Sequence, residues 1–556
     1  MSLIAFIAVI TVTLLLCVMT GPDRDDLGEF YTGYRSLSPV QSGLAIAGDY
    51  ISAGTVLGTI GIIALLGYDG LSLALSTVLS LVLMMFLLAE PLRNAGRFTM
   101  GDVLTRRTPG PAVRITSAAV TLTALLPLVV FQLAGAGDLL AVVLGFHADG
   151  FKTGSIVFLG LLMIAYAAIG GMKGTAFIQI VKTVVLLGAS TAVAVLLLER
   201  FDFSLGGLLA AAERGSGAGD AYLTAGLQFG GDQTDMISAQ LTVVLGAAVL
   251  PHITMRMFTA RSARAVRRSM SWAVSTVVVT CLLLAVIGFG AAAVVGHQGL
   301  VAADPQGKSA FLLVTQALLG QEPGPLGSLL FTGVATAVFL TLLASVAGIT
   351  LACANSLAHD LVAHGLRRVR PSHATEMAVA RAAAAGVGLV ALAVAAGARH
   401  LNLQALLMLS FCVGASAVAP ALVYSLFWRR YARTGLLATL ITGTVSALVL
   451  MTGTDLVSGS PQAVFPEADF NWFPFTTTGL VSVPLGFAAG WLGTVLSERR
   501  GAAGAEALRY EEVEPVLLAG APAADLGQMV QQHREVVEGG SLGGVRGPGD
   551  LVVRVR

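Results

Sequence analysis

The segment LAIAGDYISAG, residues 44–54, is a polar, glycine-containing patch inside an otherwise apolar stretch. At about 1.5 Å of rise per residue, a patch roughly ten residues into that stretch lies ~15 Å deep, near the middle of a ~30 Å hydrocarbon slab. A backbone break at that depth leaves N–H and C=O groups that lipid cannot satisfy, so they must face protein, water or a bound ion. Broken helices at the midplane are typical of secondary transporters.

The composition around this patch is that of a membrane protein. Of 556 residues, 55% are hydrophobic and only 12% are charged, a balance that no water-soluble globular protein needs. We therefore expect an all-α polytopic membrane protein with about 13 transmembrane helices. Thirteen apolar stretches are long enough to span a bilayer, over residues 2–20, 40–68, 70–91, 114–146, 153–171, 175–199, 236–258, 270–296, 328–358, 378–397, 402–427, 435–453 and 475–496.

The loops on the two sides of the membrane differ in charge, which predicts the orientation of the chain. One set of loops is rich in arginine, and the other carries mainly acids, such as Asp202, Asp220 and Asp232. By the positive-inside rule the basic set is cytoplasmic, which places the N-terminus outside and the C-terminus inside a multi-pass protein of the cell membrane. The basic set comprises Arg93, Arg97, Arg106, Arg107, Arg256, Arg261, Arg264, Arg267, Arg268, Arg367, Arg368, Arg370, Arg429, Arg430, Arg433, Arg499 and Arg500.

The two ends of the chain are read from their composition. The stretch 2–20 lacks a basic segment before it and a small-x-small cleavage site after it, so we favour a retained helix over a cleaved signal peptide. Residues 501–556 are predicted to form a cytoplasmic tail, largely disordered apart from a short helix near 503–513. This tail is too short and too weakly apolar for a catalytic or signalling domain.

Polar residues at the break are the first candidates for function. An acid at bilayer depth, here Asp49, is costly and usually functional, although it could instead cap the broken helix or pair with a serine. A helix that restarts at Ser52–Gly54 presents N–H groups and a positive dipole end to an anion. A small carboxylate would fit there, and the alternative is a kink with packing value only.

A second candidate is TLLASVAGITLACANS, residues 341–356, whose small and hydroxylated residues recur at spacings of three and four. Such residues commonly form a helix-packing face. The functional interpretation is a cation site, in which the Ser345 hydroxyl and the carbonyls of Thr341 and Ala344 supply hard oxygen ligands. The residues alone leave both interpretations open.

Two further basic residues lie within or beside predicted membrane helices. His252 could carry protons, although a structural role at a helix end beside Arg256 is the favoured interpretation. Lys182 lies about two turns inside the stretch 175–199. It either extends to the cytoplasmic interface or points inward and titrates.

Taken together, these segments resemble the sodium/solute symporter family, most closely its cation–acetate branch, over residues 28–500. That resemblance implies thirteen helices around a LeuT-like core of two inverted five-helix repeats, with helices 2 and 7 broken. It divides the chain into a first helix and loop (1–27), a transport core (28–434), two accessory helices (435–500) and the tail (501–556). The resemblance rests on FYTGYRSLSPVQSGLAIAGDYISAG, on GYDG at 67–70, LRNAGRFTMGDV at 92–103, IGGMKGTAFIQIVK at 169–182, LPHITMRMFT at 250–259 and NSLAHDL at 355–361.

The resemblance also implies a sodium site between the break and helix 9, formed by the carbonyls of Gly48, Ile51, Thr341 and Ala344 and the hydroxyl of Ser345. Two positions depart from the family pattern. Relatives with sodium coupling tend to carry serine at the position of Ala344 and aspartate where this chain has Gln179. Without that hydroxyl and that carboxylate, the site attracts a sodium ion less strongly, which favours lower sodium affinity or proton coupling. In some proton-coupled transporters of similar fold, a lysine at the position of Lys182 replaces the cation.

The predicted function is secondary active import of a short monocarboxylate such as acetate, together with a cation. Sodium is the first choice, and the alternatives are proton coupling or sodium-coupled transport of another solute such as proline. The coupling candidates are Asp49, Gln179 and Lys182. No cofactor, transition metal or nucleic acid is expected, and no catalytic cluster that would indicate a membrane enzyme is found in the sequence. The substrate is expected to contact Tyr50, Ser52, Ala53, Gly54, Thr55 and Gln132.

Overall fold

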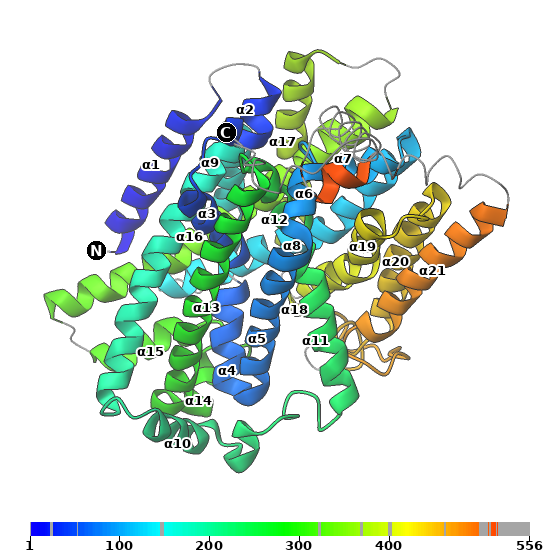
Figure 1. Cartoon of the computed structure of the whole chain (residues 1–556). Coiled ribbons are helices and arrows are strands. Elements are labelled where there is room, and N and C mark those ends of the chain that lie inside the picture. Colours follow the sequence, from blue (N-terminus) through cyan, green and yellow to red (C-terminus); the bar gives the residue numbers. More distant parts are fainter. Residues whose placement is uncertain are drawn as a thin grey trace, which may run out of the picture.

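The structure is a computed structural model, and it is helical almost throughout (Figure 1). One isolated β-bridge, between Ser458 and Phe465, is the only extended pairing among the described residues. The described residues are 2–22, 26–52, 54–144, 149–320, 324–366, 371–397, 403–460, 463–499, 510, 513–518 and 520.

The helices follow the apolar stretches of the sequence, with short 3₁₀ and π segments (η) at their ends and breaks. The first half of the chain contains α1 (Ser2–Thr20), α2 (Leu27–Thr32), η1 (Gly33–Arg35), α3 (Pro39–Tyr50), η2 (Gly54–Gly58), α4 (Thr59–Leu66), α5 (Tyr68–Leu83), η3 (Met84–Leu88), α6 (Ala89–Ala95), α7 (Met100–Arg107), α8 (Pro111–Leu144), α9 (Asp149–Arg200), α10 (Leu205–Ser216) and η4 (Gly219–Leu223). The second half contains α11 (Gln233–Ala248), α12 (Pro251–Thr254), η5 (Met255–Thr259), α13 (Ala263–Val294), α14 (Gly296–Ala303), α15 (Ala310–Leu319), α16 (Pro325–Asn355), η6 (Ser356–Leu366), α17 (His373–Gly397), α18 (Leu403–Val413), η7 (Gly414–Val418), α19 (Ala419–Phe427), α20 (Arg433–Thr452) and α21 (Gly479–Arg499).

Each of the thirteen predicted stretches has a helical counterpart. Ten described helices are long and apolar enough to cross a membrane, and the bent pair Pro39–Tyr50 and Gly54–Leu66 makes up to eleven. The long α9 holds two of the predicted stretches, because Gly171 has φ 55° and ψ −160° and turns the chain between them. A positive φ costs glycine little, so Gly171 accounts for the turn between the two stretches. The total of thirteen spans stays a prediction.

The predicted break lies where the polar patch is. Helix α3 begins at a capping box formed by Ser38 and Gln41 and ends at Tyr50. Ile51 then leaves helical geometry, with φ −80° and ψ 76°. The chain restarts in the π segment η2, and the two halves meet at 60°.

A second break lies in the predicted stretch 236–258. Helix α11 ends at Ala248, Val249 and Leu250 leave helical geometry, and Pro251 begins the short α12. Proline suits this position because its missing N–H is unpaired in the first helical turn anyway. The second broken helix implied by the family resemblance is therefore present.

The helices pack in two groups that meet at the breaks. Helices α3, α4, α5, α6, α11 and α13 pack on one another, and so do α8, α9, α16 and α17. Figure 1 shows α2, α6 and α7 at one end of the bundle and α10 and α14 at the other, with α20 and α21 paired at one side. The first end carries Arg93, Arg106 and Arg107, and we call it the arginine-rich face.

The C-terminal segment is described only in part. Helical residues 513–518 lie just beyond the helix predicted near 503–513, most of which lies outside the described residues. The Tyr510 hydroxyl donates to the carbonyl of Leu426 at 2.8 Å, and Arg107 stacks on the Tyr510 ring. This part of the tail therefore packs on the arginine-rich face.

Candidate functional site

A cavity of about 150 Å³ lies between the two helix groups, beside both breaks. Its wall is mainly apolar, with Leu128, Phe131 and Phe411 among its members. It extends from the breaks to Gln306 and Lys308 in the segment that joins α14 to α15. A small solute could therefore lie against the broken backbone in a mainly apolar environment.

Predicted substrate residues line this cavity. Tyr50, Ser52, Gly54, Thr55 and Gln132 are all in its wall, whereas Ala53 lies outside the described residues. Their grouping agrees with the prediction of a site at the break, although contact with a substrate stays a prediction.

Several polar groups at the break already have partners within the protein. The Thr55 N–H donates to Ser52 Oγ at 3.2 Å, and the Val56 N–H donates to the Ser52 carbonyl at 2.9 Å. The Tyr50 hydroxyl donates to the Thr77 carbonyl at 2.8 Å and also contacts Ser80. Fewer backbone donors are therefore available for an anion than the sequence suggested. Because the Tyr50 hydroxyl is already hydrogen-bonded within the protein, Tyr50 offers a substrate its ring rather than its hydroxyl.

Two buried polar side chains in the cavity wall lack a partner among the described residues. Both amide atoms of Gln132, on α8, and Nδ1 of His252, at the start of α12, have no hydrogen-bond partner in this part of the chain. Gln132 is 1% exposed and His252 is 6% exposed. A buried polar group without a partner costs free energy, so both groups are suited to contact a polar ligand. The favoured structural role of His252 does not account for its position in the wall.

Asp49 is held by charged and polar partners from other helices. Arg256, on η5, donates from Nε to the Asp49 carboxylate, and Gln179 Nε2 donates to its other oxygen at 2.6 Å. Arg256 also donates to the Met172 carbonyl at 3.1 Å. Asp49 therefore joins the first broken helix to the second and to α9, rather than capping the helix or pairing with a serine as the alternative interpretation had it.

Lys182 points inward, which excludes the interpretation that it extends to the membrane surface. Its side chain is fully buried. Its Nζ donates to the carbonyl of Gly48 and lies 3.2 Å from Ser345 Oγ. The lysine nitrogen therefore contacts two of the five oxygens that the family resemblance implied as sodium ligands.

Two further predicted ligands have partners beside these contacts. Gln179 Nε2 donates to the Ala344 carbonyl at 3.0 Å, and the Thr341 carbonyl accepts from Ser345 Oγ at 2.8 Å. Ile51 is at the first break, one residue after α3. The close packing of α3 on α9 depends on Gly48, because an added Cβ would lie 2.7 Å from the Gln179 carbonyl oxygen. The structure thus brings Gly48, Thr341, Ala344 and Ser345 together with the coupling candidates Asp49, Gln179 and Lys182.

Sequence reasoning missed two features of this site. Arg256 was placed at a helix end, and its ion pair with Asp49 was not expected. His252 was not placed in the cavity wall. The segment LPHITMRMFT, residues 250–259, could have indicated both features, because a proline follows an apolar stretch there and two basic residues follow the proline. That pattern marks a second break with charged residues beside it.

Two broken helices beside one cavity, two helix groups around that cavity and a buried charged cluster at the breaks define a secondary transporter with a LeuT-like fold. The sequence profile of the Sodium:solute symporter family matches residues 30–443. The chain belongs to the sodium:solute symporter family, and its members couple solute transport to a cation.

Named relatives and solved structures agree with this family. The chain is 37% identical over 511 residues to the "Monocarboxylic acid transporter" of Corynebacterium glutamicum, covering 90% of this chain and 92% of the relative. It is 34% identical over 501 residues to the "Uncharacterized symporter YwcA" of Bacillus subtilis, covering 89% and 94%. A solved Na⁺-coupled sialic acid symporter in a substrate-bound outward-open state superposes with a TM-score of 0.67 at 14% identity, covering 89% of this chain and 97% of that one. The last comparison supports the fold alone.

Proposed function

We propose that this chain imports a short-chain monocarboxylate, such as acetate, together with a cation. The observation that carries the proposal is the cavity at the two breaks. It is small, mainly apolar, and contains two buried polar side chains without described partners, Gln132 and His252. The named function of the relative from Corynebacterium glutamicum points to the same class of substrate.

The chemistry of the cavity suits a small acid. The short alkyl group of the substrate would lie against the apolar wall near Leu128 and Phe131. Its carboxylate would accept hydrogen bonds from the Gln132 amide and the His252 ring, both of which otherwise lack described partners. A sugar or an amino acid carries more polar groups, and the exposed area of this wall is mainly apolar. Proline transport is therefore the weaker alternative.

The contacts of Lys182 favour the proton over sodium as the coupling ion, although sodium was the first expectation. A sodium ion at the predicted ligands would have to displace the Lys182 nitrogen from the Gly48 carbonyl and from Ser345. A protonated lysine already supplies one positive charge there. Loss of its proton on the far side of the membrane would release that charge and complete one coupled step.

Coupling to one cation also solves an electrostatic problem. Moving an anion into a negatively charged interior costs about 2.3 kcal/mol per charge per 100 mV. One co-transported cation cancels this cost, and a second would convert the membrane potential into accumulation. Under this proposal the arginine-rich face is cytoplasmic, as the positive-inside rule predicts.

The substrate class is tested by competition in proteoliposomes with inward gradients of both protons and sodium. We expect labelled acetate to accumulate, and unlabelled propionate and pyruvate to inhibit its uptake, whereas proline and glucose do not. Liposomes without protein measure the passive entry of acetic acid. Absence of protein-dependent acetate uptake, combined with uptake of labelled proline, would overturn the monocarboxylate assignment.

A further inference from the structure

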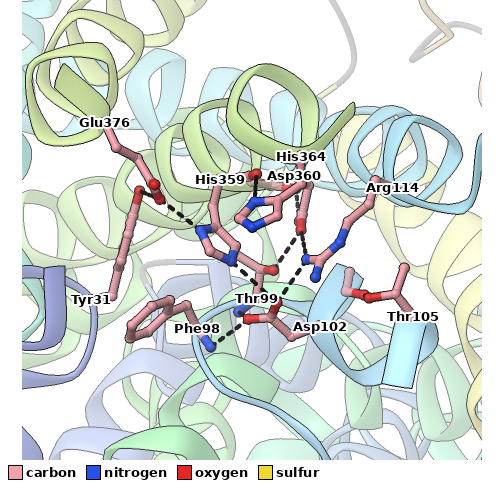
Figure 2. Close-up of polar contacts among 12 residues, drawn as sticks. Tyr31, Phe98, Thr99, Asp102, Thr105, Arg114, His359, Asp360, His364 and Glu376 are labelled. Carbon is pink, nitrogen blue, oxygen red and sulfur yellow. Dashed lines mark hydrogen bonds and ion pairs between the residues drawn. The ribbon is translucent and has the colours of Figure 1, made fainter. Parts of the chain in front are cut away.

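A second buried polar cluster lies at the arginine-rich face, away from the cavity. Figure 2 shows the ring of His359, on η6, between the carboxylates of Asp102, on α7, and Glu376, on α17. Nδ1 of the ring lies 2.6 Å from Glu376 and Nε2 lies 3.2 Å from Asp102. The His359 side chain is 6% exposed. An imidazole that donates from both nitrogens is an imidazolium, so this geometry suits the protonated ring.

Further contacts beside the imidazole involve residues of α8 and α2 and the residue that precedes α7. Arg114, on α8, places Nη1 2.7 Å from Asp102 and 2.6 Å from Asp360. The Thr99 hydroxyl, which precedes α7, donates to Asp360 at 2.7 Å. The Tyr31 hydroxyl, on α2, donates to Glu376 at 3.2 Å.

These contacts join segments that belong to different parts of the bundle. Helix α2 leads into the broken α3 and α7 follows α6, so the chain attaches Tyr31, Thr99 and Asp102 to the first helix group, although α2 packs on α9 and α7 packs on α8. Arg114 and Glu376 are on helices of the second group, and η6 continues α16 of that group. The pairs Tyr31–Glu376, Thr99–Asp360, Asp102–Arg114 and Asp102–His359 therefore each hold one of these connecting segments to the second group. A movement of the first group that carries α2 or α7 with it would break them.

The charges in the cluster favour a protonated His359. Three carboxylates face the ring or its neighbours, and Arg114 is the other cation among them. His364, whose Nδ1 lies 2.9 Å from the His359 carbonyl oxygen, packs against the ring, and Tyr31 lies against its edge. Burial alone would raise the pKa of Asp102, but the hydrogen bond and charge of His359, together with the charge of Arg114, hold it well below its usual range. Asp102 is therefore a permanent negative partner for the imidazolium.

We propose that Tyr31, Thr99, Asp102, Arg114, His359, Asp360 and Glu376 form a latch that closes the arginine-rich face while the cavity is accessible from the opposite face, and that loss of the His359 proton loosens it. The device adds to the transport cycle and does not depend on which solute is carried. When His359 is neutral it can donate to only one of its two carboxylates, and the cluster gains net negative charge. Alkaline conditions at this face therefore favour its opening.

Two engineered cysteines report the two sides of the bundle. Gly58 lines the cavity and has no atom within 4 Å of an added Cβ, so Gly58→Cys introduces a thiol without a clash. Asn355, at the end of α16, is fully buried next to η6, and its amide has no partner among the described residues. Asn355→Cys therefore removes no described hydrogen bond. Both changes are made in a full-length chain whose four native cysteines are replaced by alanine, and labelling with a polar maleimide is followed in detergent.

The latch variants are Tyr31→Phe and Thr99→Val, each of which removes one connecting hydrogen bond and keeps the shape of the side chain. The matched control is Thr105→Val, because the Thr105 hydroxyl donates to the Gly101 carbonyl at 2.6 Å within α7. We expect each latch variant to speed labelling of Asn355→Cys about fivefold, the effect of one hydrogen bond on a two-state equilibrium. Labelling of Gly58→Cys should fall or stay constant, and the control should change neither rate.

The titration of His359 is tested in the same chain. Because a maleimide reacts with the thiolate, each rate is divided by that of Gly58→Cys at the same pH. This ratio should rise for Asn355→Cys as the pH is raised from acid to alkaline, and in His359→Gln, which keeps one donor and stays neutral, it should be high at every pH. Equal acceleration at both cysteines in the latch variants would indicate general loosening and overturn the latch. So would unchanged labelling of Asn355→Cys in both Tyr31→Phe and Thr99→Val. Because the assay uses no substrate, it stands or falls separately from the monocarboxylate assignment.

Discussion

Arg256 and Asp49 form a buried ion pair that joins the two broken helices across 207 positions of sequence. Their side chains are 3% and 2% exposed. Removing one member of such a pair leaves an uncompensated buried charge, which is strongly destabilising. The pair therefore fixes the relative position of the two breaks, and with it the shape of the cavity.

The first prediction concerns the stability of this pair. Arg256→Gln should destabilise the protein by about 3–5 kcal/mol and lower the midpoint of thermal unfolding in detergent. Arg267→Gln is the control, because the Arg267–Glu90 pair is largely exposed on the arginine side, with 63% of its side-chain area accessible. Such a pair is worth at most about 1 kcal/mol. Equal midpoints for the two variants would refute a structural role for the Asp49–Arg256 pair.

The second prediction concerns Lys182. If its ammonium supplies the coupling charge, uptake in the wild-type protein should fall as the external pH rises through the titration of this amine, and Lys182→Met should give a flat pH profile. Lys173→Met serves as the control, because Lys173 is on the same helix but only half-buried beside Gly33. A pH profile in Lys182→Met that matches the wild type would exclude titration of this residue during transport.

The third prediction concerns Ser345, which lies 3.2 Å from the Lys182 nitrogen. Ser345→Ala removes an oxygen that stabilises the ammonium, so the pH at which uptake is half-maximal should fall. Under sodium coupling the same change should instead raise the half-saturating sodium concentration. Ser190→Ala, on the same helix as Lys182 and without a described partner, should change neither quantity. Constancy of both quantities in Ser345→Ala would remove this hydroxyl from the cation site.

The fourth prediction separates substrate contact from structure at Gln132. Because its amide has no partner among the described residues, Gln132→Leu should leave thermal stability unchanged and raise the half-saturating acetate concentration about tenfold, the effect of one hydrogen bond to a charged group. Gln179→Leu should lower stability instead, because Gln179 donates to Asp49 and to the Ala344 carbonyl. Unaltered acetate affinity in Gln132→Leu would argue against the proposed carboxylate contact.

The first break could be predicted from sequence because its cause is local. A polar patch with two glycines inside an apolar stretch cannot continue as a lipid-facing helix, and residues 44–54 show this directly. The meeting of Gly48, Lys182 and Ser345 came from the family resemblance, since no periodicity relates three separate helices. The coupling ion could not be settled in the same way, because the direction of the Lys182 side chain depends on packing around it.

The latch could not be predicted because its members come from segments that are unrelated in sequence. Tyr31 and Glu376 are 345 positions apart, and Asp102 and His359 are 257 positions apart. Taken singly, each is an ordinary polar residue near the end of a helix. Only the fold, which brings α2 and α7 against η6 and α17, gives them a common role.

The proposed coupling depends most on the Lys182 nitrogen, which takes the place of a metal cation at the break. The direct measurement is uptake of labelled acetate into proteoliposomes with proton and sodium gradients imposed separately, corrected for entry into liposomes without protein. An inward proton gradient without sodium should drive protein-dependent accumulation, and an inward sodium gradient at equal pH should not. Accumulation driven by sodium alone, with no response to the proton gradient, would contradict the account.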